Sequence, residues 1–321
     1  MQILKTRLRA ELPRIEAALQ HAVRDLPQPV QPLAEHILNA GGKRLRPFFT
    51  VLMARLLGYT ADDIYELAIS MEMLHAATLL HDDVLDNAAT RRGKQVAHLR
   101  FGITPTILAG DALLASANQI VARHGDTRLA TCFSDATART AAGEIREIEF
   151  MRRVDQDPSV YLDVVTGKTA WLIRASCEMG ALKAQAGPAH RTAAALYGVN
   201  VGMAFQMVDD ALDFAPMAIT GKPTGGDLLE GKLTPPVQLY RASLPAAEQS
   251  AFDAAFTTGL ITQKDAENIS QRIREQGFDA QTRVQAKEFL DKAAVGLHSL
   301  PDGPEQAILM QMMDYVQNRE K

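Results

Sequence analysis

The chain has 321 residues, of which 47% are hydrophobic and 6% aromatic, and its formal net charge is −4 at pH 7. This balance argues against a broad basic surface of the kind that binds nucleic acid or acidic membranes. The apolar content is sufficient for a large core, and a large helical fold can hold a chain of this length in one unit. We therefore expect one domain over residues 1–321 and no nucleic-acid partner.

Helical periodicity dominates the chain, and the alternation typical of strands is scarce. One helix face runs from Leu67 through Leu74 to Asp82. The pattern predicts an all-α fold. In chain order, helices are expected near residues 4–24, 46–57, 67–82, 105–124, 130–152, 159–179, 189–214, 235–244, 246–257, 264–276, 280–299 and 305–318.

Two segments differ from the rest of this pattern. The longest uncharged stretch, residues 192–208, is too short to span a bilayer and is interpreted as a buried helix. Gly198 and Gly202 inside it would let another helix approach closely. Residues 215–236 hold four glycines and four prolines, so they are predicted to form an irregular segment of the kind that often acts as a lid.

The cysteines and the N-terminal residues indicate where in the cell the protein is expected. Cys132 and Cys177 show neither metal-binding nor redox spacing, and each is interpreted as a small buried side chain. Residues 1–9 are basic and amphipathic but lack the apolar core of a signal peptide, so they are interpreted as part of a first helix. We expect a protein of the reducing cytoplasm without a transmembrane segment.

A short acidic pattern, Asp-Asp-x-x-Asp, occurs twice, at residues 82–86 and 209–213. Each copy ends a long apolar, helix-like run. The first and last aspartates of each copy are four residues apart, which places both carboxylates on one helix face, one turn apart. Such clusters oppose the helix dipole and are costly to bury unless a cation collects them. Hard oxygen ligands of this kind suit magnesium, which then binds phosphate oxygens.

Positive charge gathers near a glycine turn, Gly41-Gly42, that opens a helix. Lys43, Arg44 and Arg46 follow it. Cations at a helix N-terminus are unfavourable by themselves, and a bound anion would remove the conflict and use the free backbone amides. Each lysine or arginine alone is more often a solvated surface charge. Together, the basic residues would suffice for two diphosphates.

With these motifs in place, the chain resembles the trans-isoprenyl diphosphate synthases, the polyprenyl synthetase family. The resemblance implies a large single-domain helical bundle around a deep central cavity, the isoprenoid synthase fold. The segments that carry it occur in family order: Gly41–Pro47, Leu74–Asp86, Arg91–Gly93, Leu108–Leu114, Gly143-Glu144, Gly167–Thr169, Phe205–Asp213 and Gly221–Pro235.

The resemblance also implies metal ions and two diphosphate sites. Asp82 and Asp86 would hold two magnesium ions on the allylic diphosphate, and Asp209 would hold a third with Asp213 behind it. The allylic diphosphate would contact Arg91, Lys168, Lys222 and Lys232. Isopentenyl diphosphate would contact Lys43, Arg46, His75 and Arg92. Thr169 and Gln206 would point dipoles toward the reacting carbons.

The implied reaction is the ionisation of an allylic diphosphate followed by attack of isopentenyl diphosphate. Cations stabilise the departing diphosphate, and apolar helices with Thr169 and Gln206 protect the allylic cation. No general base is evident, and in the family the released diphosphate takes the proton. Closure of the segment from Lys222 to Lys232 would exclude water.

Product length is predicted from two small residues, Ala77 and Thr78, which lie five and four positions before the first aspartate. In the family a bulky side chain there blocks the growing chain. Small residues resemble long-chain enzymes that make quinone side chains of about eight to ten isoprene units. Glu147 departs from the family, in which many members carry glutamine at this position.

Other interpretations remain open at this point. A short-chain farnesyl or geranylgeranyl diphosphate synthase is the main alternative. A class I terpene cyclase would leave Lys43, Arg46 and Arg92 without a purpose, and a non-catalytic subunit typically loses aspartates that this chain keeps. The family favours a homodimer, and peripheral contact with a membrane during product release remains open.

Overall fold

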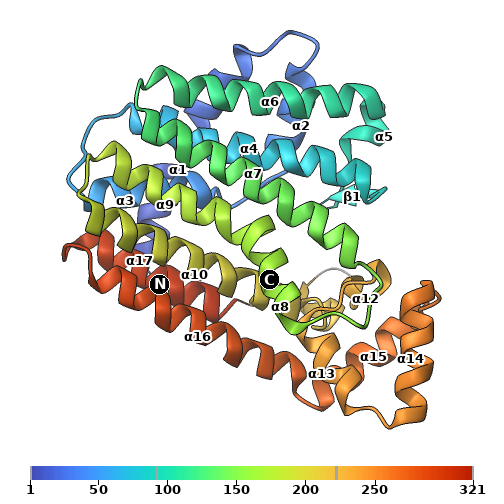
Figure 1. Ribbon diagram of the computed structural model, residues 1–321. Coiled ribbons are helices and arrows are strands. Elements are labelled where there is room, and N and C mark those ends of the chain that lie inside the picture. The colour runs from blue at the N-terminus through green and yellow to red at the C-terminus, as the bar shows by residue number, and fades with distance from the viewer. Residues whose placement is uncertain (1, 92, 221–222, 320–321) are drawn as a thin grey trace. The chain divides into compact units, whose positions relative to one another are not determined.

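The computed structural model describes residues 2–91, 93–220 and 223–319 (Figure 1). The helices are α1 (Gln2–Arg24), α2 (Gln31–Leu38), α3 (Leu45–Leu56), α4 (Ile64–Leu85), α5 (Ala97–Phe101), α6 (Ile103–Arg123), α7 (Thr127–Phe150), α8 (Pro158–Val165), α9 (Trp171–Lys183), α10 (Pro188–Leu212), α11 (Met217–Thr220), α12 (Gly226–Glu230), α13 (Pro235–Ser243), α14 (Ala246–Thr258), α15 (Gln263–Glu275), α16 (Phe278–His298) and α17 (Pro304–Gln317). A π-helical turn, η1 (Thr166–Ala170), lies between α8 and α9. The hairpin strands β1 (Thr90–Arg91) and β2 (Lys94–Gln95) pair antiparallel. The predicted all-α class is confirmed.

The chain divides into two compact units. Unit 1 comprises Met1–Thr137, Ala175–Ala195 and His298–Leu309, and unit 2 comprises Ala138–Arg174, Leu196–Leu297 and Met310–Lys321. The helices α7, α9, α10, α16 and α17 have residues in both.

Unit 1 is built around α4, which packs against α1, α2, α3 and α6. Its apolar residues occur on all sides of the helix, and Ile64, Leu67 and Met71 are completely buried. A helix with this distribution belongs in the centre of a protein. The first aspartate pattern therefore lies at the end of the central helix of its unit.

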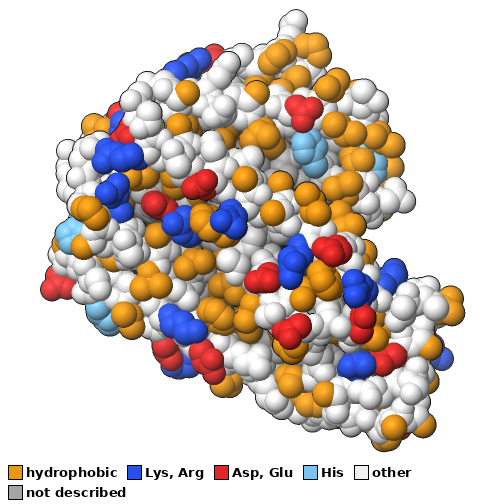
Figure 2. Space-filling model, in the orientation of Figure 1, with side chains coloured by type: hydrophobic (Ala, Val, Ile, Leu, Met, Phe, Trp, Pro, Cys, Tyr) orange, Lys and Arg blue, Asp and Glu red, His pale blue; other side chains and the backbone are white. Residues whose placement is uncertain are grey.

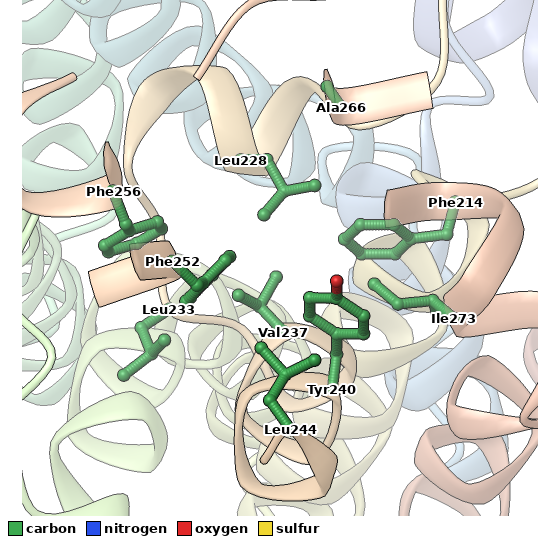
Figure 3. Close-up of a cluster of buried hydrophobic side chains, with 10 residues drawn as sticks. All are labelled: Phe214, Leu228, Leu233, Val237, Tyr240, Leu244, Phe252, Phe256, Ala266 and Ile273. Carbon is green, nitrogen blue, oxygen red and sulfur yellow. The ribbon is translucent and has the colours of Figure 1, made fainter. Parts of the chain in front are cut away.

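Unit 2 has an apolar cluster that fixes the segment after the second aspartate pattern (Figure 3). Phe214, which directly follows Asp213, packs in this cluster with Leu228 and Leu233. Phe252 lies edge-on to Tyr240, with ring centroids 5.7 Å apart. The same cluster thus holds the end of α10 and both flanks of the segment that carries Lys232.

Glycines let helices of unit 2 approach closely, as predicted. A Cβ atom at Gly198 would lie 2.7 Å from the Cα of Arg174, and one at Gly202 would lie 2.6 Å from the Cα of Ala170. A Cβ atom at Gly143 would lie 2.3 Å from the backbone nitrogen of Lys168. These contacts bring α10 against α9 and η1, and α7 against η1, which carries Lys168 and Thr169.

Several predicted boundaries are wrong. The helix expected over 159–179 is α8, η1 and α9, and such π-turns are often found at functional sites. The segment 215–236 is not irregular throughout, because α11 and α12 lie within it. The prediction also missed α2, which is short and has a proline in its first turn, a position where proline suits a helix.

Both cysteines are buried, as expected, and neither is in a disulfide. Within the described residues, every helix is too short or too polar to cross a membrane.

Candidate active site

The first aspartate pattern has the predicted one-turn spacing. The backbone N–H of Asp86 donates to the carbonyl oxygen of Asp82 at 2.8 Å, so the helical turn continues to Asp86. Asp82 is half-buried and Asp86 is exposed. Asp83 between them is only 1% exposed, and Arg91 donates to its carboxylate at 2.8 Å. Arg91, predicted to contact a diphosphate, is therefore held beside this pattern.

The second pattern repeats this geometry at the end of α10. The N–H of Asp213 donates to the carbonyl oxygen of Asp209 at 3.0 Å. The guanidinium of Arg319 pairs with the Asp209 carboxylate and lies 4.6 Å from the ring centroid of Phe205. Asp213 accepts a hydrogen bond of 3.0 Å from the N–H of Asp227, which orients its carboxylate.

Asp210, the middle aspartate, is 6% exposed and makes two hydrogen bonds. Tyr161 donates its hydroxyl at 2.5 Å, and Gln206 donates its amide at 2.8 Å. The hydroxyl of Thr169 donates to the Gln206 carbonyl at 2.8 Å. Burial raises the pKa of Asp210 to about 7, although both hydrogen bonds act in the opposite direction. Burial and Asp210 also raise the pKa of Tyr161, which keeps its phenol protonated.

Two predicted lysines form a network with glutamates. Lys168 pairs with Glu144 at 2.7 Å and also with Glu147. Lys232 pairs with Glu230 at 2.7 Å and lies 3.7 Å from Glu147. Burial lowers the pKa of each lysine, but the carboxylates outweigh it and the net direction is upward. Both lysines are therefore positively charged at neutral pH.

Both lysines and Glu147 line one cavity of about 120 Å³ in unit 2, together with Tyr161 and Asp210. Four predicted catalytic residues are brought together there: Lys168, Thr169, Gln206 and Lys232. Apolar walls come from Phe150, Val164, Val165 and Leu233. A cavity with lysines at one part of its wall and apolar groups at another suits an amphiphile with an anionic head.

The predicted isopentenyl diphosphate residues that the structure describes lie in unit 1. Lys43 is exposed just before α3, Arg46 is half-buried in its first turn, and His75 is half-buried on α4. Arg44 is used differently. It pairs with Glu16 at 2.7 Å and with Glu72 at 3.0 Å in the protein interior, so its charge serves the fold.

Two predicted ligands, Arg92 and Lys222, lie outside the described residues. At the predicted product-length positions, Ala77 is 2% exposed on α4. Thr78 is half-buried, and its hydroxyl donates to the carbonyl oxygen of His75 at 2.9 Å.

Sequence reasoning missed several residues of the site: Tyr161 and Asp227 line the cavity, and Glu230 pairs with Lys232. Tyr161 lies seven residues before Lys168, which is two helical turns, and this spacing could have placed it on the same face. Nothing in the sequence could have shown Arg319 beside Asp209, because 110 residues separate them.

The aspartate carboxylates are suitable ligands for magnesium, but they do not form a complete coordination shell by themselves. Among the described residues, no three His, Cys, Asp or Glu side chains are arranged to hold a metal by themselves. Magnesium commonly takes one or two carboxylates and completes its shell with water and substrate phosphates. Asp83 and Asp227 each keep one buried carboxylate oxygen without a hydrogen-bond partner, so the acidic clusters are not internally satisfied.

Charged side chains on the face shown in Figure 2 are of both signs and lie interspersed. This distribution agrees with the modest net charge of −4. An anion at this cavity would therefore be attracted by the local lysine arrangement rather than by a broad field.

Comparisons with known proteins agree with this geometry. A family model described as Polyprenyl synthetase matches residues 27–273. The chain is 32% identical to heptaprenyl diphosphate synthase component 2 of Bacillus subtilis, over 95% of this chain and 87% of that protein. It is 34% identical to a decaprenyl diphosphate synthase from Rhodobacter capsulatus, with a TM-score of 0.92 and coverage of 98% and 99%. A polyprenyl synthase from Caulobacter crescentus CB15, complexed with calcium and isoprenyl diphosphate, is 33% identical, with a TM-score of 0.93 and coverage of 100% and 98%.

Proposed function

Because this chain belongs to the polyprenyl synthetase family, and is thus a trans-prenyltransferase, we propose that it adds isopentenyl diphosphate head-to-tail to an allylic diphosphate such as farnesyl diphosphate. The product would be a long-chain all-trans polyprenyl diphosphate for a quinone side chain. The observation that carries the proposal is the repeated geometry of the two aspartate pairs, each one turn apart at the end of a buried helix. Such pairs bind a diphosphate through metal ions.

The aspartates would bind metal ions together with the diphosphate. In unit 1 we assign Asp82 and Asp86 to two magnesium ions, and in unit 2 Asp209 to a third, with Asp213 behind it. When bound, magnesium neutralises the leaving diphosphate as a Lewis acid. The Caulobacter crescentus enzyme, with its calcium and isoprenyl diphosphate, supports metal binding next to such a substrate.

The lysines of unit 2 would exchange their carboxylate partners for the diphosphate. Lys168 and Lys232 both contact Glu147, so their charges are held at the cavity before substrate arrives. The proposal also assigns Arg91 and Lys222 to the allylic diphosphate. Fixed positive charges stabilise a departing anion strongly because they need no reorganisation during the reaction.

The polar groups next to the lysines would act on the carbon skeleton. Thr169 and Gln206 line the same cavity as the lysines and as the apolar walls. Their dipoles would stabilise the allylic cation, while the apolar side chains exclude water from it. For isopentenyl diphosphate we assign Lys43, Arg46, His75 and Arg92.

The long-chain product is supported by the size and burial of Ala77. Its side chain is 2% exposed, and the neighbouring Thr78 is also small. A packed interior does not yield by several ångströms, so a small residue here leaves room that a large one would remove. Names of relatives at this identity agree on prenyl diphosphate synthesis but differ in product length.

A homodimer acting in the cytoplasm is the proposed form of the enzyme, with residues 1–321 as one polyprenyl synthetase domain. Ile103, Ile107 and Leu108 on α6 are 57%, 40% and 58% exposed. A group of exposed apolar side chains on one helix is typical of a protein interface. Light scattering coupled to gel filtration would test this, and a monomer at micromolar concentration would contradict it.

The proposed activity is tested by incubation with farnesyl diphosphate, excess isopentenyl diphosphate and magnesium, followed by sizing of the dephosphorylated products. We expect all-trans products of about eight to ten isoprene units. A matched sample with a chelator should give no condensation. Products limited to farnesyl or geranylgeranyl size would favour the short-chain alternative, and a cyclic hydrocarbon from farnesyl diphosphate alone would contradict the proposal.

A further inference from the structure

Four side chains on the wall of the unit 2 cavity form one continuous hydrogen-bonded chain. They run in the order Tyr161, Asp210, Gln206 and Thr169, and all four line the cavity. The proposed function assigns a role to Gln206 and Thr169 only. Tyr161 comes from α8, Thr169 from η1, and the other two from α10, so three elements meet in this hydrogen-bonded chain.

The chemistry of the members sets the direction of these hydrogen bonds. Asp210 accepts a hydrogen bond from the Tyr161 hydroxyl on one oxygen and from the Gln206 amide on the other. The amide nitrogen of Gln206 therefore faces Asp210, and its carbonyl oxygen faces Thr169. That carbonyl cannot donate, so the Thr169 hydroxyl must donate to it.

We propose that Tyr161 and Asp210 are positioning residues that lock this direction, so that Thr169 presents oxygen lone pairs rather than a proton to the cavity. This inference rests on the proposed function, because lone pairs turned inward stabilise a developing allylic cation and a hydroxyl proton turned inward would oppose it. Tyr161 and Asp210 act on the reaction only through the orientation of Gln206 and Thr169.

Removal of the Tyr161 hydroxyl should weaken the control over the hydrogen-bond direction without changing the shape of the cavity. In Tyr161→Phe, one oxygen of the buried Asp210 loses its donor, and an unsatisfied buried acceptor is costly. The Asp210 carboxylate is then no longer held in place, so it fixes the direction of the Gln206 amide less firmly, and the Thr169 hydroxyl can turn its proton toward the cavity. The ring and its packing stay in place.

The first measurement is the kinetics of a single condensation. We expect Tyr161→Phe to lower kcat roughly tenfold, the change that corresponds to about 1.4 kcal/mol in the barrier. The KM for both substrates should remain within about twofold, since the chain does not hold a diphosphate. Tyr240→Phe is the matched control, because Tyr240 is a buried tyrosine of the same unit that does not line the cavity. We expect wild-type kinetics from it.

The second measurement repeats the substitution in a Thr169→Val background. If Tyr161 acts through Thr169, Tyr161→Phe should cause no further loss there, whereas a general structural role would lower kcat equally in both backgrounds. Asp210→Asn, a second variant of unchanged size, should show the same dependence on Thr169. It keeps the test valid should Tyr161→Phe fold poorly.

Wild-type kcat in folded Tyr161→Phe, or an equal loss in both backgrounds, would overturn the inference while the proposed function stands. No condensation by the wild-type protein would instead overturn the proposed function, and this inference with it.

Discussion

At the residue scale, the middle and the outer aspartates of each pattern differ in their contacts and exposure. The middle aspartate of each pattern is turned into the protein, Asp83 toward Arg91 and Asp210 toward Tyr161 and Gln206. The outer aspartates lie one turn apart and are more exposed in the first pattern. Asp210 accepts a hydrogen bond on each carboxylate oxygen, and one oxygen of Asp83 pairs with Arg91, so we assign the metal-bound diphosphate to the outer pairs.

Asp82→Ala tests the outer pair. We expect kcat to fall by roughly two to three orders of magnitude, because a bound metal contributes several kcal/mol to stabilising the departing charge. The melting temperature should change little, since the half-buried Asp82 is not part of the apolar core. Asp25→Ala, at an exposed aspartate of unit 1, is the control. Near-normal turnover by Asp82→Ala would show that the metal assignment is wrong.

Glu147→Gln tests the lysine network. Glu147 contacts both Lys168 and Lys232, and burial raises its pKa less than these lysines lower it, so it is ionised at neutral pH. Removing its charge leaves both lysines more available to a diphosphate. We expect the apparent KM for the allylic diphosphate to fall by roughly fivefold, which corresponds to about 1 kcal/mol.

Steady-state kinetics with farnesyl diphosphate as the varied substrate would measure this change. Glu144→Gln is the matched control, because among the described residues Glu144 pairs with Lys168 but not with Lys232, so its change should have a smaller effect. An increase in KM for Glu147→Gln would mean that Glu147 holds the lysines in a productive position rather than competing with substrate.

At the scale of elements, close helix contacts at glycines position the residues of the candidate active site. Gly143 and Gly202 allow α7 and α10 to approach η1, which brings Glu147 to Lys168 and Gln206 to Thr169. The π-turn of η1 departs from regular α-helical geometry at the very residues that line the cavity. The site therefore depends on backbone contacts that no charged side chain reveals.

Gly202→Ala tests this packing. In an open helix the change would stabilise by about 1 kcal/mol, because alanine is the better helix former. Here the new Cβ would lie 2.6 Å from the Cα of Ala170, and such overpacking costs about 1–3 kcal/mol or more. We expect the clash to dominate and the melting temperature to fall by several degrees, together with kcat.

The control for this substitution is Gly187→Ala, where an added Cβ would meet nothing within 4 Å. Thermal unfolding followed by circular dichroism would compare the two variants. Equal melting temperatures for Gly202→Ala and the wild type would show that α10 and η1 can separate without cost.

At the scale of the whole molecule, Ala77→Tyr tests product length. Ala77 lies on the central helix of unit 1, and its small side chain is 2% exposed. If the growing product passes this residue, a tyrosine ring should stop elongation after a few additions, because a packed interior cannot move aside. We expect farnesyl- or geranylgeranyl-sized products with the first condensation largely retained.

Chromatography of the dephosphorylated products would measure the shift, with Ala77→Ser as a small-residue control that should keep the wild-type lengths. An unchanged distribution from folded, active Ala77→Tyr would place the limit on chain length elsewhere, and the long-chain proposal would lose its main support.

The sequence by itself determined the helical class, the one-turn aspartate pairs and the close approach at Gly198 and Gly202. These follow from local periodicity, since the positions of i and i+4 on a helix depend on nothing outside the helix. The tertiary structure decided which polar and charged side chains pair with one another inside the protein. Arg44 forms ion pairs with Glu16 and Glu72, and Tyr161 donates a hydrogen bond to Asp210, which lies 49 residues away in the sequence. Such pairings depend on how helices pack, and no spacing along the chain encodes them.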